Sequence, residues 1–521
     1  MSAASGAWTR RGLLAAVGAT ALLACAPKVL EPGLPEVPGA LTILHTNDLH
    51  GHFLPEPAEW HDGRPPMGGF ARLDAEVDHL RATRPRKGVL LLDGGDQLTG
   101  TPLSDLVVEG SKGGAMNRFF GLLRYDAWAV GNHEFDKGLD NLVAYAKASP
   151  MVPLSANLRA PDGVSPLLPN QEFSHVFERG GMKVGVIGAT TDQLKGLMSR
   201  EDFERLTLLK VEDAVRAEVE RLEPVTDLIV VLSHIGRDSD ERLARYVPGI
   251  DLIVGGHSHT RMYEPSRVND TWIVQAGSYC RTLGVVDLVV RDDRITDFRY
   301  ELRELTPETA PGEPSVDVVE LTKAYQGELD AVFGEVVAEA PELLGRDYHR
   351  ESALGRWITD ALRVAAGTDI GMYNGGGLRA DIAAGPVTRG ALFNAFPFGN
   401  ELSTFEITGK DLQAIVLKNI IAEHDRKRGF LPLSGISWTW RVRNDAPELL
   451  EVKVGESPLD LDRLYTVATN SYVVEQWEKH LGVAPKNLTI RGLTDYDAAV
   501  EYARTAASLV DPGDRRSRRV E

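Results

Sequence analysis

Short apolar runs alternate with helical patterns from Leu41 onward, and most of these runs end in residues that can bind a metal ion. Alternation of this kind is typical of a layered α/β domain. A sixth run, "KVGVIGATT" at 183–191, lacks such an ending, whereas five others lead into "NDLH" at 47–50, "DGGD" at 93–96, "GNHEFD" at 131–136, "SH" at 233–234 and "GHSH" at 256–259. Because sites in open α/β sheets form at the carboxyl ends of the strands, we expect the five groups to converge on one edge.

The residue types in these groups indicate which ions would suit them. They offer carboxylate, amide and imidazole ligands with no cysteine nearby, a mixture that suits Mn, Zn, Fe, Co or Mg. Seven or eight such ligands are too many for one tetrahedral ion and fit a pair of ions that share a carboxylate. Single histidines near strands are more often structural, and we expect this of His45 and His52.

Size and charge exclude several functional classes. A chain of 521 residues is too long for one core and suggests two or three domains. The net charge of −18 argues against a nucleic-acid polymer as partner, but it allows a small anionic substrate held by local cations or metals. With only two cysteines, Cys25 and Cys280, a disulfide framework is not the basis of stability.

The first 24 residues have the pattern of an export signal. Arg10 and Arg11 precede an apolar run of 13 residues, Gly12 to Ala24, which suits a signal-peptide core and is too short to span a bilayer. "LLAC", ending at Cys25, resembles a bacterial lipobox, and the alternative is an ordinary cleaved signal. We expect export to the cell envelope or periplasm by the twin-arginine or the general route, with a lipid on Cys25. Residues 25–40, rich in Pro and Gly, would form a tether.

The ordered set of metal-competent motifs resembles the calcineurin-like metallophosphoesterases, and within them the bacterial 5′-nucleotidase/UDP-sugar hydrolase family. The resemblance covers nearly the whole mature chain, including "QAGSYCRTLGVVDL" at 275–288. It implies a four-layer α-β-β-α metallophosphoesterase domain over 41–304, a linker helix over 305–330 and a smaller α/β 5′-nucleotidase C-terminal domain over 331–521. The Pro- and Gly-containing stretch from Pro307 to Pro314 would act as the hinge between the domains.

The resemblance also implies roles for the motif residues. The first ion would be held by Asp48, His50 and His259, the second by Asn132, His234 and His257, and Asp96 would bridge the two. His259 stands where some relatives have Gln, a change that would affect metal preference. His133, kept cationic by Asp136, would donate hydrogen bonds to the phosphate or protonate the leaving oxygen. Glu134 and Phe135 would be structural.

The second half contains no further set of metal ligands, and its most telling segment is "YNGGGLR" at 373–379. Three consecutive glycines let the backbone approach a ligand closely. By resemblance, Arg350 and Arg379 would bind the phosphate or ribose region, Asn374 the base or sugar, and Phe430 would stack on the base. The alternative for Phe430 is a core aromatic residue.

The second half also departs from the family pattern. Relatives carry "GGDGF" or "GGDGY" after a late strand, which gives the second ring of an aromatic clamp, and here "NSYVVEQW" at 470–477 stands in its place. Tyr472 or Trp477 is the candidate substitute. Arg356 replaces an Asn that relatives generally have. We therefore expect broad base preference.

The function that these observations predict is an exported dimetal phosphohydrolase that removes phosphate from nucleotides by attack of a metal-activated hydroxide. The alternatives are a hydrolase of UDP-sugars, cyclic nucleotides, or other phosphoesters or sulfur esters, and a lipoprotein that binds a ligand without turnover. The sequence leaves open the metal identity and the oligomeric state.

Overall fold

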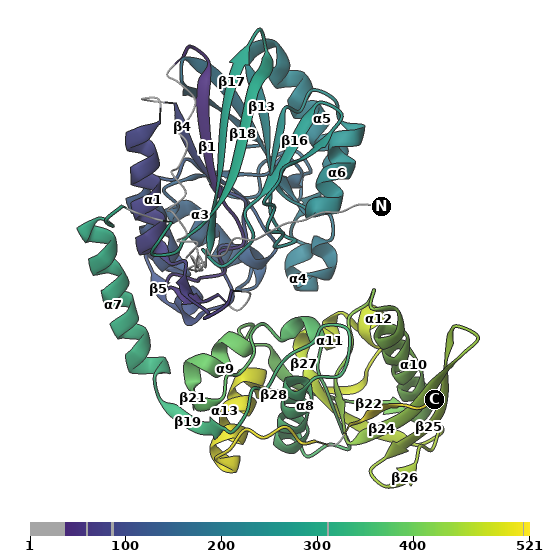
Figure 1. The fold of residues 1–521 in the computed structure, drawn as a ribbon. Helices are drawn as coiled ribbons and strands as arrows, with labels where there is room; N and C mark the ends of the chain where they lie inside the picture. Colours follow the sequence, from purple (N-terminus) through teal and green to yellow (C-terminus); the bar gives the residue numbers. More distant parts are fainter. Residues whose placement is uncertain (1–36, 59–60, 85–87, 310–311, 514) are drawn as a thin grey trace, which may run out of the picture.

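The computed structural model describes residues 37–58, 61–84, 88–309, 312–513 and 515–521 (Figure 1). The predicted signal peptide, the lipid-bearing Cys25 and most of the predicted tether lie outside these residues. Within the described part of the chain, no helix combines the length and the apolar character needed to cross a membrane.

Two six-stranded sheets form the N-terminal domain, the upper one in Figure 1. The strands of the first sheet, in spatial order, are β18 (Arg294–Glu304), β17 (Thr282–Arg291), β1 (Ala40–Thr46), β4 (Val89–Asp93), β7 (Ala127–Ala129) and β8 (Val152–Leu154). Those of the second are β10 (Ser174–Arg179), β11 (Met182–Thr190), β13 (Leu228–His234), β14 (Leu252–Gly255), β16 (Thr271–Gln275) and β15 (Ser266–Val268). Strands β1, β4, β7 and β8 run parallel, as do β11, β13, β14 and β16, so their carboxyl ends meet at one edge of each sheet.

Both faces of each sheet are buried, which explains why the strands read as continuous apolar runs. In β1, Ile43 points into the core between the sheets, whereas Leu44 points to the helices on the outer face. The outer face of the first sheet is covered by α1 (Phe70–Thr83), α2 (Gly114–Leu123) and α3 (Leu139–Ala148), and α7 (Val316–Phe333) packs on α1 and α2. The second sheet is covered by α5 (Val211–Leu222) and α6 (Arg237–Tyr246). This confirms the predicted four-layer α-β-β-α arrangement.

The C-terminal domain is built on a mixed sheet with helices on both faces. Its strands, in spatial order, are β23 (Leu433–Ser434), β20 (Ile370–Met372), β27 (Leu464–Asn470), β22 (Glu401–Thr408) and β28 (Lys486–Thr494). One face packs on α8 (Ala353–Ala366), α9 (Arg389–Ala395) and α13 (Asp495–Ala506), and the other packs on α10 (Gly409–Asp425). A second sheet contains β26 (Ser457–Pro458), β25 (Ala446–Val454), β24 (Ile436–Arg443) and β29 (Ser517–Arg519).

Several short elements complete the chain. The strand pairs are β2 (Glu56–Pro57) with β3 (Pro66–Met67), β5 (Val107–Val108) with β6 (Ser111–Lys112), β9 (Leu158–Arg159) with β12 (Thr207–Leu208) and β19 (Val336–Ala340) with β21 (Gly385–Thr388). Short helices are α4 (Arg200–Phe203), α11 (Ser471–Glu475) and α12 (Trp477–His480), with 3₁₀ turns η1 (Pro102–Asp105), η2 (His133–Phe135), η3 (Leu194–Gly196), η4 (Glu223–Val225) and η5 (Gly375–Gly377).

Helix α7 connects the two domains but belongs to the core of the first (Figure 1). Val318, Tyr325 and Leu329 are buried against that core, and the backbone N–H of Ser315 donates to the Asp74 carboxylate at 2.7 Å. A rotation at the predicted hinge, Pro307 to Pro314, would pull these side chains out of the core. The packing of α7 therefore favours a hinge after this helix, near Gly334, over the predicted one at Pro307 to Pro314.

Candidate metal centre and substrate cleft

The predicted ligands follow strands of both sheets of the N-terminal domain. Asp48 and His50 follow β1, Asp96 follows β4, and Asn132 follows β7, all in the first sheet; His234 ends β13 and His257 follows β14 in the second. Hydrogen bonds join these loops: Asp48 N–H donates to Gly95 O at 2.8 Å within the first sheet, and His257 N–H, after β14 of the second sheet, donates to Asp48 Oδ2 at 3.0 Å. The carboxyl edges of the two sheets thus form one site, as the strand-end pattern predicted.

Five of the predicted ligands have backbone conformations that ordinary residues avoid. The φ angles are 53° at Asp48, 50° at His50, 55° at Asp96, 73° at His257 and 51° at His259. A non-glycine residue in this region costs about 1–3 kcal/mol and persists only where its surroundings enforce it. Such conformations gathered in one place are typical of a functional site, since each turns a side chain inward at the end of a strand.

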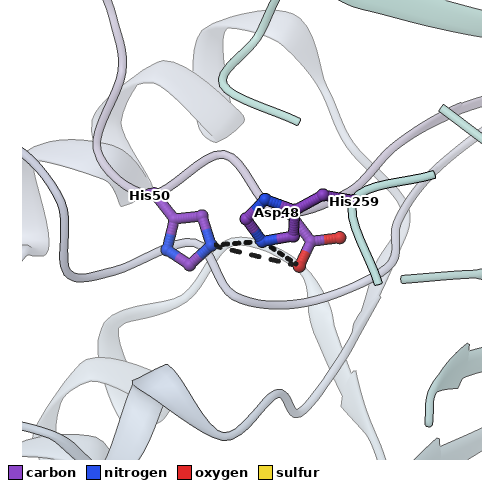
Figure 2. Close-up of side chains that lie close together, drawn as sticks. All are labelled: Asp48, His50 and His259. Atoms are coloured by element: carbon purple, nitrogen blue, oxygen red, sulfur yellow. Dashed lines mark hydrogen bonds and ion pairs between the residues drawn. The ribbon is translucent and has the colours of Figure 1, made fainter. Parts of the chain in front are cut away.

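Asp48, His50 and His259 form the first of three groups of possible metal ligands (Figure 2). Their ligand atoms all lie within 4.8 Å of one another. His259 Nε2 is 3.3 Å from Asp48 Oδ1 and 3.1 Å from His50 Nε2. Two imidazole nitrogens that face each other at this distance direct their lone pairs to a common point, as ligands of one ion do.

Asp96 belongs to both of the other groups. One of them contains Asp96, His234 and His257, with His234 Nε2 only 3.1 Å from Asp96 Oδ2. The other contains His50, Asp96 and His133, whose Nε2 lies 4.0 Å from Asp96 Oδ2. Asp96 therefore lies between the two sets of histidines, which is where a shared carboxylate has to be.

Hydrogen bonds to backbone carbonyl groups fix the orientation of two of the imidazoles. Nδ1 of His50 lies 2.8 Å from Thr99 O, and Nδ1 of His234 lies 2.6 Å from Gly94 O. A carbonyl oxygen can only accept, so each Nδ1 carries its proton and donates it. Nε2 is therefore the atom with which both rings can bind a cation at the centre.

The charges at the centre suit a divalent cation. Burial lowers the pKa of His50 and lowers that of His257 to about 4, so both rings are neutral near pH 7, as ligands must be. Burial alone would raise the pKa of Asp96, but His234 and His133 outweigh it and hold the pKa well below its usual range. Burial alone would likewise lower the pKa of His234, but Asp96 outweighs it and raises the pKa to about 10, so an ion bound at this position has to displace a proton that His234 shares with Asp96.

The amide of Asn132 supports the same interpretation. Its Oδ1 is buried and accepts no hydrogen bond from any described residue, and the residue lines the same cavity as Asp96. An unpaired buried amide oxygen is costly, and a cation would satisfy it. The donor set present in the structure therefore fits two divalent ions.

His133 and Asp136 form a close pair beside this centre. His133 Nδ1 lies 2.6 Å from Asp136 Oδ2, and the backbone N–H of His133 donates to Asp96 Oδ1 at 2.8 Å. Burial alone would lower the pKa of His133, but the carboxylates of Asp136 and Asp96 outweigh it and raise the pKa. The pair therefore favours a protonated imidazole whose Nε2 faces the centre.

Glu134 has a larger role than the sequence indicated. Its buried carboxylate accepts backbone hydrogen bonds from Gln97 at 2.7 Å, Gly131 at 2.8 Å, Asp96 at 3.1 Å and Leu98 at 3.3 Å. These amides belong to the loops after β4 and β7, which carry Asp96 and Asn132. Glu134 thus holds two ligand-bearing loops together.

The other residues expected to be structural lie outside the three groups. Phe135 is buried in the core of the N-terminal domain, and His45 is buried beside Tyr300 with a ring-centroid distance of 6.2 Å. His52 binds Glu56 through Nδ1 at 2.6 Å. Arg356, the departure from the family pattern, forms an ion pair with Asp511 at 2.5 Å within the C-terminal domain.

A cavity of about 770 Å³ lies between the two domains. The N-terminal domain contributes Asp96, Asn132, His133, Asp136, His257 and His259 to its wall, and the C-terminal domain contributes Asn374, Arg379 and Phe430 among others. Asn374 is largely buried, and its Oδ1 accepts from Asn470 Nδ2 at 3.0 Å. Most of the predicted site residues of both domains therefore face one space.

Two predicted substrate contacts differ in the structure. Arg350 does not line the cavity, and its Nε donates to Asp347 Oδ2 at 2.7 Å, so the charge predicted to bind substrate is already paired. Phe430 lines the cavity but is only 2% exposed and packs within the core, 6.3 Å from the Trp438 ring. This packing favours the alternative interpretation of Phe430 as a core aromatic. Of the candidate substitutes for the missing ring, Tyr472 lines the cavity and Trp477 does not.

Phe398 is an aromatic residue of the cavity wall that the sequence pattern did not identify. It lines the cavity, is partly exposed, and has its ring 5.7 Å from that of His133 and 5.8 Å from the Arg379 guanidinium. Its segment, "AFPFGN" at 395–400, has no periodicity or spacing that distinguishes Phe398 from the buried Phe396 beside it. Only the fold shows which ring faces the metal centre.

Comparison with known proteins matches both halves of the chain. The profile of the calcineurin-like phosphoesterases matches residues 41–261, and that of the 5′-nucleotidase C-terminal domain matches residues 336–481. The chain belongs to the 5′-nucleotidase family. Members of this family are hydrolases of phosphoesters, and the calcineurin-like domain implies divalent metal ions.

Individual relatives agree with this assignment. The chain is 29% identical over 91% of its length to the trifunctional nucleotide phosphoesterase YfkN of Bacillus subtilis, of which it spans 34%. It is 28% identical to the 5′-nucleotidase of Vibrio vulnificus over 89% of each chain. The crystal structure of a 5′-nucleotidase precursor from Thermus thermophilus superposes with a TM-score of 0.80 at 29% identity, covering 92% of this chain and 99% of that one.

Proposed function

We propose that this member of the family is an exported 5′-nucleotidase-like phosphohydrolase that removes phosphate from nucleotides. The observation that carries the proposal is Asp96, which is shared between two groups of metal-competent residues at the wall of a cavity that also contains Asn374 and Arg379 of the second domain. In this proposal, residues 41–304 form the catalytic domain and residues 331–521 the substrate-binding domain.

The proposed ligands divide between two ions. Asp48, His50 and His259 would hold one, Asn132, His234 and His257 the other, and Asp96 both. Two divalent ions held there would neutralise phosphate oxygens and make a bound water nucleophilic at neutral pH.

Three residues outside the metal ligands would contact the substrate: His133, Arg379 and Phe398. The protonated Nε2 of His133 donates a hydrogen bond to the phosphate or transfers its proton to the leaving oxygen, and Asp136 keeps that proton in place. Arg379 brings a permanent positive charge to the same cavity, where it pairs with the phosphate or contacts the ribose region. Phe398 offers a partly exposed ring on which a nucleobase can stack.

The test is phosphate release by purified protein with Mn, Zn, Co, Fe or Mg, measured on 5′-mononucleotides, UDP-sugars, cyclic nucleotides and p-nitrophenyl phosphate. We expect metal-dependent release that is fastest on 5′-mononucleotides. In the Asp96→Asn variant, activity and the occupancy of both metal sites should fall together, because the shared ligand is lost. Metal-independent activity, or an Asp96→Asn protein that keeps two ions and full activity, would overturn the proposal.

Export and anchoring are part of the proposal but rest on residues 1–25 alone. Fractionation of the native cells should place the mature protein in the membrane fraction of the envelope. The Cys25→Ser variant should be released in soluble form or remain unprocessed. A wild-type protein found only in the soluble fraction would leave the plain signal peptide as the explanation.

A further inference from the structure

Lys418, Lys479 and Arg428 line the same cavity as the metal centre. Lys418 is on α10, Lys479 is on α12, and Arg428 lies in the loop after α10. Of the ion pairs formed among the described residues, none includes any of these three side chains. In a chain whose net charge is −18, where carboxylates are abundant, cations without a carboxylate partner around one cavity indicate an anionic ligand.

The two lysines belong to one cluster. Lys479 Nζ donates to the Tyr472 hydroxyl at 3.3 Å and lies 5.8 Å from the centre of that ring. The Tyr472 ring in turn is 5.6 Å from the ring of His480. Lys418 Nζ lies over the backbone just after α12, since a Cβ added to Gly482 would be 2.9 Å from it. Both ammonium groups thus lie near the end of α12.

His480 does not neutralise the lysines and adds no charge of its own. Burial and the charges of Lys479 and Lys418 together lower its pKa to about 4, so the ring is neutral at pH 7. The carboxylate of Glu475 also lines the cavity, but it forms no ion pair among the described residues, and the charges that act on it come from Asp202, Glu201 and Glu401. The charges of both lysines act on the same ring and have no carboxylate partner among the described residues, an arrangement that a bound anion would stabilise.

The cluster is held in position relative to the catalytic domain. The Tyr472 hydroxyl donates to Gly196 O at 2.9 Å, and Gln476 Nε2 donates to Met198 O at 3.3 Å. Both acceptors belong to the N-terminal domain. Burial raises the pKa of Tyr472 to about 12, and the nearby charge of Asp136 contributes to this shift. Tyr472 therefore lies between the His133–Asp136 pair and the lysines. The cavity therefore extends from the metal centre past Tyr472 to Lys479 and Lys418.

We propose that Lys418 and Lys479 form a second anion subsite, which binds a negatively charged group at the end of the substrate remote from the phosphate that is cleaved. This rests on the proposed function, because it requires the other phosphate at the metal centre. The substrate class that fits is a nucleoside 5′-phosphate with a second phosphate elsewhere. A cavity of about 770 Å³ is in the upper part of the range for small-molecule sites, which leaves room for the second group.

The reaction on such a substrate is ordinary phosphomonoester hydrolysis. For adenosine 3′,5′-bisphosphate, one water is consumed, the 5′ P–O bond to the leaving oxygen breaks, and a proton goes to that oxygen. The products are orthophosphate and adenosine 3′-monophosphate. The 3′-phosphate is bound but not cleaved.

The experiment compares kcat/KM for adenosine 3′,5′-bisphosphate with kcat/KM for AMP, in the metal-loaded full-length protein. We expect wild type to prefer the bisphosphate, and Lys418→Ala and Lys479→Ala each to lower the ratio of the two values about tenfold. Lys418→Arg, which keeps the charge, should retain most of the preference. Lys410→Ala, an exposed lysine on the same helix but outside the cavity, should leave the ratio unchanged.

Equal kcat/KM values for the two substrates in wild type, or equal losses on both in the lysine variants, would overturn the subsite. Calorimetric binding of the same two compounds separates this failure from that of the proposed function. If no substrate released phosphate, the hydrolase proposal would fail, yet tighter binding of the bisphosphate that disappears in both lysine variants would still support the subsite. Equal binding of the two compounds would overturn it.

Discussion

The ring of His133 lies 5.7 Å from the ring of Phe398, although the two residues come from different domains. A second contact between the domains lies next to it, where Lys137 Nζ donates to Pro397 O at 3.3 Å. In this arrangement the proposed acid of the catalytic domain and an aromatic surface of the substrate-binding domain face the same cavity. A nucleotide with its phosphate at the metal centre would therefore place its organic part beside Phe398.

Phe398 and Phe430 should behave differently when each is replaced by Ala. Phe398→Ala removes a partly exposed stacking surface, so we expect KM for AMP to rise about 10-fold or more, with a smaller effect on p-nitrophenyl phosphate. Phe430→Ala leaves a hole in a packed core and should lower the free energy of unfolding by about 3–5 kcal/mol. Steady-state kinetics and thermal unfolding of both variants check this. A stable Phe430→Ala protein with a large rise in KM would restore Phe430 as the stacking residue.

His133 should act in its protonated form, with Asp136 setting the pH at which the proton is lost. His133→Ala should lower kcat about 10²–10⁴-fold with metal content unchanged. The Asp136 charge raises the pKa of His133, so Asp136→Asn should lower that pKa and move the alkaline limb of the kcat–pH profile to lower pH. Elemental analysis provides the control. Loss of metal from either variant would mean that the residue is a ligand, and an alkaline limb unmoved in Asp136→Asn would contradict the pairing.

Glu134 should control metal affinity without binding metal. In Glu134→Gln one carboxylate oxygen becomes an NH₂ group, which faces backbone N–H donors and cannot accept from them. The loops that carry Asp96 and Asn132 would then separate, and we expect metal affinity to fall about 10–100-fold. Metal titration of chelator-treated protein measures this, with the exposed Glu109→Gln as the matched control. Unchanged metal affinity in Glu134→Gln would mean that Glu134 does not hold the ligand-bearing loops in position.

The metal centre was predictable from sequence because its ligands recur at one structural position, directly after the carboxyl end of a strand. Each ligand group follows an apolar run, and parallel strands bring their carboxyl ends together whatever the details of the loops. The same pattern predicted the α/β fold class, and the family resemblance predicted the four-layer α-β-β-α arrangement.

The substrate-binding side was less predictable, because it depends on which side of a loop faces the other domain. Phe398 and Phe396 are two residues apart and of the same type, yet one lines the cavity and the other is fully buried. Arg350 was expected to bind substrate, but Asp347, three residues earlier, pairs with it. Helix α7 was expected to follow a hinge, and only its packing shows that it belongs to the core of the first domain. Such outcomes depend on tertiary contacts that local sequence does not specify.

Asp240 gives a prediction for the pH dependence of stability. Its carboxyl group is fully buried and accepts from Ser233 Oγ at 2.5 Å, and burial raises its pKa to about 7 from a usual value of 3.8. Between these two pH values the folded protein holds a proton that the unfolded chain has lost. The contribution of Asp240 to stability is therefore greatest at low pH, declines as the pH rises from about 4 to about 7, and is constant above that.

Asp240→Asn keeps the shape of the side chain and removes its ionisation. The difference in Tm between the variant and wild type should therefore increase in favour of the variant from about pH 4 to pH 7 and then level off. Other buried carboxyl groups with raised pKa values, such as Asp93 and Asp251, contribute equally to the Tm of both proteins, so their contributions cancel in the difference. Scanning calorimetry across this range measures the effect, and Asp238→Asn, an exposed position on the same helix, should give a nearly constant difference. If the Asp240→Asn difference were also constant, or declined toward pH 7, Asp240 would be ionised in the folded protein, and a cation or donor near its Oδ2 would have to be found.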